Sequence, residues 1–382
     1  MDAVFTGHYH DYFSGNYDGV LYTGLGSSGG ACIPGPTGLQ YHFIWVTVNK
    51  EEISIAPIAL GGVKPWDELT GAEYRLVNSI KTEAMNLDKP PVDISVTVPE
   101  TQVKVKIVNL NEQITLEDTL RWQIPDGWRI TPLYLPVKIE PNKIYEANFR
   151  VQCNGPLYPT PTLSIQYPYA AGKKFKLEKY MQVTRKAYAY EAKKSLVVDG
   201  KLNEEIWKNP VRVMFGPDGS SMTIEPVDFY FAWDKANLYI AAKCTEKKMD
   251  SIFASATEHD GAVYAEDCIG YFFQPDINDG PVFQIYFNPL GTPFDQKINV
   301  KNKKAQDADR KWNGQYKVKT IKGSDYWSIE AKIPLDQLGA IGEKGKIWAI
   351  NFRRKQKRFN SAADWQIPIS YDPEDFGILI MK

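Results

Sequence analysis

The sequence has few of the residues from which metal centres and disulfide frameworks are built. Four histidines and four cysteines occur among 382 residues, and no two cysteines form a Cys-x-x-Cys pair. The cysteines therefore fit buried thiols better than a zinc site or a disulfide framework. One alternative stays open, because Cys244 and Cys268 could meet across neighbouring strands.

Long apolar runs and an excess of one charge are also absent. No stretch of about 18 apolar residues occurs, which argues against a membrane-spanning helix. The 45 Lys and Arg residues balance 46 Asp and Glu residues, so the chain has no electrostatic footprint for nucleic acid. No basic segment followed by an apolar one opens the chain, so no signal peptide is visible. Cysteine usage leaves the compartment open, and the sequence leaves the oligomeric state open.

Aromatic residues and strand patterns are what the sequence has in abundance. Its 22 Tyr, 17 Phe and 10 Trp make up 13% of the chain. At about 150 residues per domain, the length suggests two or three domains. We expect a mainly β, multidomain protein with domains at residues 1–87, 93–185 and 190–382.

The first of these regions combines short strands and Gly-rich loops with one helix. Helical spacing of apolar residues predicts a helix over Trp66–Leu87, and Pro90–Pro91 ends it. Residues 93–185 alternate polar and apolar side chains and predict a small β-sandwich. Residues 190–382 repeat strand patterns without the helices of βαβ units and predict a larger β-sandwich.

Two of the four histidines lie close together in Gly7-His8-Tyr9-His10. Glycine lets the chain turn sharply, and the i, i+2 spacing in extended backbone can aim both imidazoles at one centre. The motif therefore predicts a metal clamp, although a pair of exposed loop histidines explains the same pattern.

The flanking residues make this motif resemble part of a known enzyme family. Residues 2–10, 17–22 and 24–30, followed by Ile58-Ala59-Leu60-Gly61, closely resemble the final third of calcineurin-like metallophosphoesterases. The resemblance implies that His8 and His10 are two late ligands of a dinuclear divalent-metal site. It also implies that residues 1–87 are the C-terminal segment of an α/β domain.

The other metal ligands of that family have no counterpart here. Its Asp-x-His, Gly-Asp-x-x-Asp and Gly-Asn-His motifs come before Gly-His-x-His, which begins at residue 7 in this chain. Two histidines cannot hold two hard divalent ions without carboxylate ligands. We therefore expect an incomplete domain, a metal pair only in an intact parent protein, and no phosphoesterase activity from this chain alone. Metal-dependent phosphoester hydrolysis is the alternative function if the missing half is supplied.

The middle region resembles a spacer rather than a site. Segment 135–143, followed by an alternating strand, resembles the small immunoglobulin-like spacers of bacterial surface and secreted hydrolases. The resemblance implies a rigid immunoglobulin-like spacer and an extracellular, periplasmic or cell-surface location. A fold of this kind implies no function of its own.

The longest resemblance covers nearly all of residues 190–382. Motifs in family order are Val198–Trp207, Asn237–Ala242, Glu266–Phe272, Gln284–Thr292, Trp327–Leu335, Trp348–Arg354, Trp365 and Phe376-Gly377. They resemble family 9 carbohydrate-binding modules. The resemblance implies a β-sandwich that binds a carbohydrate ligand, and carbohydrate binding is the function we expect.

Members of that family hold a terminal sugar between two aromatic rings. Carried over from Glu266-Asp267 and from Phe376-Gly377, the two rings fall at Tyr264 and Tyr371. A flat ring against the C–H face of a sugar is the contact that such a site needs.

Polar positions of the family are matched less completely. Gln284 and Arg353 fall near polar positions, and Trp365 is a further expected sugar contact. The family's acidic ligand falls at Gly270, so the identity of that ligand is open. We expect Trp207, Trp327 and Trp348 to lie in the core, and Trp312 to lie in a loop where it is either exposed or buried.

Two further possibilities follow from the same region. The resemblance implies a possible structural calcium ion, although the sequence has no run of ligands like a calcium loop. The alternative to a sugar-binding module is a structural or interaction module with no sugar ligand.

Overall fold

The computed structural model describes residues 1–93, 95–212 and 214–382. These residues form two compact units. Unit 1 comprises Met1–Asp88, Glu100–Gln152 and Thr160–Met181, and unit 2 comprises Lys89–Pro99, Cys153–Pro159 and Gln182–Lys382. Strands dominate both units, which confirms the predicted mainly β, multidomain β-sandwich class.

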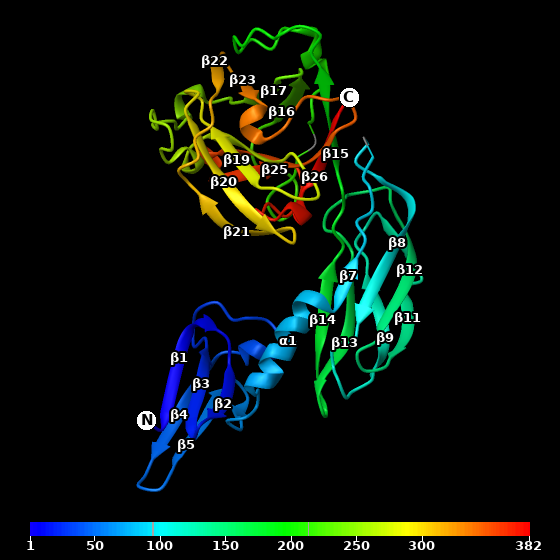
Figure 1. The fold of residues 1–382 in the computed structure, drawn as a ribbon, viewed down its shortest axis with the longest axis vertical. Coiled ribbons are helices and arrows are strands. Elements are labelled where there is room, and N and C mark those ends of the chain that lie inside the picture. The colour runs from blue at the N-terminus through cyan, green and yellow to red at the C-terminus, as the bar shows by residue number, and fades with distance from the viewer. Residues whose placement is uncertain (94, 213) are drawn as a thin grey trace. The chain divides into compact units, whose positions relative to one another are not determined.

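Two small sheets open unit 1 (Figure 1). The first joins β1 (Ala3–His10), β3 (Val20–Gly26) and β2 (Phe13–Tyr17) in that order, with β1 and β3 parallel. The second joins β4 (His42–Val48), β5 (Ile53–Ala59) and β6 (Gly62–Val63). Consecutive side chains of β1 and β4 are largely exposed, so neither face of these two strands is well covered.

Helix α1 (Gly71–Glu83) follows these sheets and begins with a capping box. The Thr70 side chain accepts the Glu73 N–H, and the Glu73 carboxylate accepts the Thr70 N–H. The predicted helix over Trp66–Leu87 is therefore confirmed in its centre. Its predicted start is wrong, because α1 begins at Gly71 and not at Trp66. Its predicted end is also wrong, because Met85–Leu87 leaves the helix and forms strand β7.

The rest of unit 1 is built from two four-stranded sheets. One has the order β10 (Trp128–Thr131), β12 (Ile144–Cys153), β8 (Val98–Val108) and β7, and the other has the order β11 (Tyr134–Ile139), β9 (Leu116–Gln123), β13 (Thr162–Ala170) and β14 (Lys173–Tyr180). Buried and exposed side chains alternate along β8 and β12, as the period-two pattern predicts. The Trp122 ring of one sheet packs 5.5 Å from the Phe149 ring of the other.

Unit 2 is built around one twelve-stranded sheet of described residues. Its strands are β15 (Lys186–Glu191), β16 (Val227–Trp233), β17 (Asn237–Thr245), β18 (Cys268–Gln274), β19 (Val282–Phe287), β20 (Pro293–Lys301), β21 (Lys304–Asp309), β22 (Lys317–Lys322), β23 (Tyr326–Pro334), β24 (Ile347–Gln356), β25 (Ser361–Asp364) and β26 (Gly377–Met381). The order is β21-β20-β19-β18-β24-β26-β15-β16-β17-β23-β22, with β25 beside β24.

This sheet curls so that its two halves face each other across the main core. The Phe229 ring of β16 lies 5.7 Å from the Tyr271 ring of β18 and 4.8 Å from the Phe352 ring of β24. Short 3-10 helices connect the strands: η2 (Glu205–Lys208), η3 (Met249–Ser251), η4 (Val263–Ala265), η5 (Asp336–Leu338), η6 (Lys357–Phe359) and η7 (Pro373–Asp375), with η1 (Pro36–Gly38) in unit 1.

The tryptophans that we expected in the core are buried there. Trp207, Trp327 and Trp348 are all buried, which confirms that expectation. Trp312 is partly buried, and its ring packs 5.0 Å from that of Phe283.

The open question about cysteine pairing is settled by the two faces of the sheet. Cys244 packs in the main core, whereas Cys268 packs in a second cluster on the other side of the sheet. All four cysteines are free, so the alternative of a Cys244–Cys268 disulfide is wrong. Within the described residues, no helix has both the length and the apolarity to cross a membrane.

Candidate functional site

One face of the unit 2 sheet carries an apolar cluster that lies outside the main core. Along β18, Tyr271 and Phe273 point into the main core, and Phe272 between them points to the opposite side. On that side Phe272 joins Tyr286 of β19 and Phe376. We call this surface the outer aromatic face: Tyr264, Phe272, Tyr286, Phe294, Tyr371 and Phe376.

Tyr264 and Tyr371 both lie on the outer aromatic face. Tyr264 is 48% exposed and its ring lies 5.0 Å from Phe294, while Tyr371 is 46% exposed and its ring lies 6.0 Å from Phe272. Tyr286 connects the two pairs, with its ring 6.4 Å from Phe294 and 6.1 Å from Phe272. Two half-exposed rings therefore stand at the ends of one continuous strip of buried or half-buried rings.

The middle of this strip is formed around Gly270. Gly270 pairs with Tyr286 on one side and with Arg353 on the other. A Cβ at Gly270 would lie 2.4 Å from the Tyr286 ring, so this ring occupies the space of a longer side chain. Burial is the main reason that the pKa of Tyr286 is raised, and the neighbouring Tyr371 adds to the rise.

Arg353 is the charged group in this middle part. Its side chain is 16% exposed, and its Nε lies 2.9 Å from Oδ1 of the fully buried Asp364. Burial raises the pKa of Asp364 to about 6, and Arg353 opposes the rise. Arg353 and Asp364 are paired in register between β24 and β25, so the ion pair has a fixed place on the sheet.

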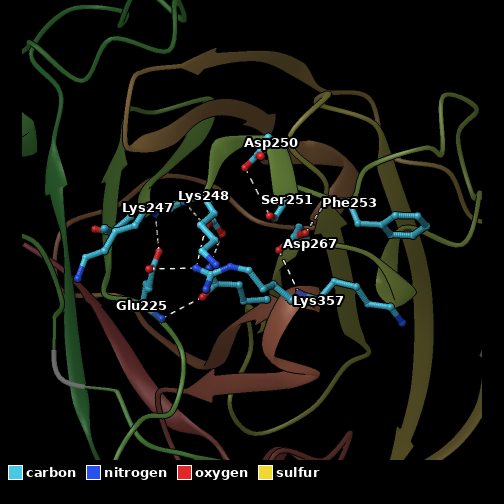
Figure 2. Close-up of polar contacts among 12 residues, drawn as sticks. Glu225, Lys247, Lys248, Asp250, Ser251, Phe253, Asp267 and Lys357 are labelled. Carbon is cyan, nitrogen blue, oxygen red and sulfur yellow. Dashed lines mark hydrogen bonds and ion pairs between the residues drawn. The ribbon is translucent and has the colours of Figure 1, made fainter.

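The loop that carries Tyr264 is held by the adjacent carboxylates of Glu266 and Asp267. Asp267 accepts the N–H groups of Phe253 at 2.7 Å and Lys357 at 3.1 Å; Figure 2 draws both bonds. Glu266 accepts the Ser255 N–H at 2.8 Å. These bonds tie the segment before β18 to the sheet and so position Tyr264.

The loop that carries Tyr371 is held in a similar way. Ser370 donates to Asp375 at 2.7 Å, and Asp372 accepts the N–H of Ala305 in β21 at 2.7 Å. The N–H of Asp372 in turn donates to the Ser370 hydroxyl at 3.0 Å. Both tyrosines therefore stand on segments that are fixed by side-chain hydrogen bonds of neighbouring residues.

A hollow of about 250 Å³ opens beside Tyr264. Its lining includes Ala265, Arg353, Lys355 and Lys357, and its one carboxylate among the described lining residues is Glu266. The hollow is therefore rich in positive charge. Neither the Tyr264 nor the Tyr371 ring is among the described residues that line it, so the hollow adjoins the strip of rings rather than separating the two tyrosines.

Two residues that we expected to contact sugar lie below the surface. Trp365 is fully buried in the main core and stacks on Phe352 with ring centroids 4.7 Å apart, so its ring does not reach the outer aromatic face. This corrects the expectation for Trp365. Gln284 is 4% exposed, and its amide oxygen accepts a hydrogen bond from Gln296. Gln284 lies on the same side of β19 as Tyr286, and its role as a sugar contact stays a prediction.

One group of possible metal ligands occurs in the part of the chain that the structure describes: His259, Asp260 and Asp295. Oδ2 of Asp295 lies 2.9 Å from Nε2 of His259 and accepts the Tyr316 hydroxyl at 2.8 Å. Calcium is bound through oxygen ligands. Oδ2 of Asp295 accepts these bonds, whereas Oδ1 of Asp295 is buried and has no hydrogen-bond partner among the described residues. No ion is placed by these contacts, and the structural calcium ion stays a prediction.

His8 and His10 lie in an irregular part of β1. Both have positive φ angles, 80° and 60°, and the pairing of β1 with β3 shifts between Thr6 and His10. Nδ1 of His10 lies 2.6 Å from the Ala31 carbonyl oxygen. The group of possible metal ligands found among the described residues does not include these histidines, and their role as metal ligands stays a prediction.

Comparisons with known proteins give structural neighbours for about half of the chain. No family model matches the sequence, and no curated protein matches it. The solved structures include a carbohydrate-binding protein described as putative from Bacteroides uniformis, with 18% identity, a TM-score of 0.41, and coverage of 52% of this chain and 99% of that one. Family 9 carbohydrate-binding modules from Caldicellulosiruptor kristjanssonii, in complex with glucose or cellotriose, also match at 18% identity and a TM-score of 0.38. They cover 52% of this chain and 95% or 93% of their own.

Sequence reasoning missed several residues of the outer aromatic face. Tyr286 and Phe294 connect the two tyrosines, and Asp364 holds Arg353. Strand alternation was the available signal for Tyr286, because it falls two residues after Gln284 on the same face of β19. No local signal marks Asp364, whose partner lies eleven residues away along a hairpin.

Proposed function

We propose that unit 2 binds carbohydrate on the outer aromatic face, with Tyr264 and Tyr371 as the two contact rings. The observation that carries the proposal is their half-exposure at the two ends of one strip of rings. If both tyrosines were buried, they would be ordinary core residues. If they were exposed and isolated from each other, they would be ordinary surface residues. Two exposed rings on a shared aromatic base offer flat apolar surface to the C–H faces of a sugar.

Arg353 and Lys355 supply the polar part of the proposed contact. Arg353 lies beside Gly270 in the middle of the strip, and Nζ of Lys355 donates to the Tyr264 carbonyl at 2.6 Å. Ammonium and guanidinium groups donate hydrogen bonds and accept none. The sugar hydroxyls near them therefore act as acceptors.

Titration calorimetry of the full chain with a panel of mono- and oligosaccharides tests the proposal. Because the rings are tyrosines and Gly270 offers no charged acceptor, we expect dissociation constants between millimolar and micromolar, roughly −4 to −8 kcal/mol. Tyr264→Ala and Tyr371→Ala should each weaken binding by about 2 kcal/mol if they are main contacts. Their free energies of unfolding should change little, because both rings are half exposed.

Tyr134→Ala is the matched control. Tyr134 lies in β11 of unit 1 and is 64% exposed, so its loss should leave sugar binding unchanged. If both tyrosine variants of unit 2 bind as the unchanged chain does, the assignment of these rings is wrong. If no saccharide of the panel binds, the alternative of a structural or interaction module replaces the proposal.

A further inference from the structure

A cationic pocket of unit 2 uses none of the residues of the outer aromatic face. It has a volume of about 460 Å³ and is lined in part by Lys186, Tyr188 and Tyr190 of β15. These three side chains share one face of the strand, because Ala187 and Ala189 between them point into the main core. A pocket of this size holds a ligand as large as a sugar ring or somewhat larger.

We propose that this pocket is a second binding site, which takes a small organic oxyanion, a carboxylated or sulfated sugar unit. Its charge is the first argument. Four cationic side chains line it, Arg185, Lys186, Lys208 and Arg212, against one carboxylate, Asp93.

The carboxylates near the pocket do not cancel this charge. Asp93 accepts the Thr97 N–H at 2.8 Å and the Thr97 hydroxyl at 2.7 Å, so its oxygens are directed to its own turn. Arg212 pairs with Asp228 at 3.1 Å and Lys208 pairs with Glu205, but the Arg212 and Lys208 side chains are 68% and 65% exposed. Exposed pairs of this kind are weak and leave the guanidinium free to exchange partners.

Arg185 adds a buried positive charge beside the pocket. It is buried, its guanidinium lies 5.3 Å from the Phe215 ring centroid and 5.1 Å from that of Trp365, and it donates to the Trp365 carbonyl. Burial lowers the pKa of Arg185 to about 10, which leaves it charged at neutral pH.

The two tyrosines argue for an organic ligand rather than a bare ion. Tyr188 and Tyr190 present ring surface beside the cations, and Nζ of Lys382 lies 5.0 Å and 5.9 Å from their ring centroids. Aromatic surface next to fixed positive charge suits a sugar ring that carries an acidic substituent.

Calorimetry of the full chain with glucuronate, glucose 6-sulfate, inorganic sulfate and glucose tests the proposal. Glucuronate or glucose 6-sulfate should bind, and affinity should fall as sodium chloride is raised. The double variant Lys186→Gln/Lys208→Gln should weaken this binding at least tenfold, because both lysines are exposed and line the pocket. Lys317→Gln, an exposed lysine in β22, is the matched control and should bind as the unchanged chain does.

Each outcome decides the proposal and separates it from the site on the outer aromatic face. Tyr371→Ala should keep its affinity for the acidic sugar, so loss of the acidic sugar in that variant would assign the ligand to the aromatic face and overturn the pocket. Absence of binding by every anion tested would overturn it as well. Glucose binding that the lysine variant weakens would show that the pocket takes a neutral sugar, and inorganic sulfate as the one bound anion would show an ion site without a place for a sugar.

Discussion

At the scale of single residues, the buried carboxylates of unit 2 accept backbone N–H groups and thereby hold loops. Glu330 accepts the N–H groups of Asp199 at 2.8 Å and Gly200 at 2.7 Å, in the same manner as Glu266 and Asp267 beside Tyr264. Burial raises the pKa of Glu330 and of Asp267. These acids are conspicuous in the sequence, but their oxygens are occupied within the protein.

Asp364 gives the first prediction, a pH-dependent stability. Its pKa in the folded chain is about 6, above the usual value of 3.8. Between these two pH values the folded state binds more protons at this site than the unfolded state does, so this group lowers the free energy of unfolding as the pH rises. Urea denaturation should show that the free energy of unfolding falls between pH 4.5 and pH 7 by on the order of 2 kcal/mol more in the unchanged chain than in Asp364→Asn. Parallel pH dependence in the two proteins would contradict this assignment.

Gly270 gives a prediction about packing. A Cβ at this position would lie 2.4 Å from the Tyr286 ring, so Gly270→Ala forces that ring or the sheet to move. We expect a loss of about 1–3 kcal/mol in the free energy of unfolding. Gly29→Ala is the control, because a Cβ there meets no described atom within 4 Å. Equal stability of the two variants in urea denaturation would show that the Tyr286 ring can move aside without a loss in the free energy of unfolding.

At the scale of elements, the least protected part of unit 1 precedes α1. Strands β1 and β4 are exposed on both faces. The segment that leads into α1 is better held, because Nζ of Lys173 in β14 donates to the Glu68 carbonyl at 2.7 Å and to Glu73 at 3.1 Å. Limited trypsin digestion followed by mass spectrometry should therefore cut first at Lys50, in the exposed turn between β4 and β5. Fragments that begin within unit 2 while residues 1–63 remain intact would contradict this order.

The irregular part of β1 gives a prediction about metal binding. The group of possible metal ligands found among the described residues contains neither His8 nor His10. Without carboxylate ligands beside them, these histidines should bind divalent metal weakly. We expect no hydrolysis of bis(p-nitrophenyl) phosphate by the purified chain with added manganese. Turnover that is lost in His10→Ala would establish the alternative of a metal-dependent phosphoester hydrolase.

Elements were predicted well where the local sequence pattern determines the structure. They were predicted poorly where contact with a residue far away in the sequence determines it. Alternation along β8 and β12 matched the burial of their side chains. Met85–Leu87 was predicted as helix because its spacing fits one, but pairing with β8 overrides that preference. Trp365 was expected at the site and lies in the core, because its stacking on Phe352 depends on how the sheet curls. Local sequence patterns do not reveal the order of the strands, and the stacking of Trp365 on Phe352 depends on that order.

At the scale of the whole molecule, ligand binding should act on one of the two compact units. The proposed sugar contacts and the cationic pocket both belong to unit 2, and units with separate cores generally unfold as separate transitions. A saccharide that binds at Tyr264 and Tyr371 should stabilise unit 2 by about 2.7 kcal/mol at a concentration 100 times its dissociation constant. In differential scanning calorimetry we expect one transition to move to higher temperature and the other to stay. The same saccharide should move neither transition in the Tyr264→Ala/Tyr371→Ala variant at that concentration. A single transition that moves as a whole would show that the two units unfold together.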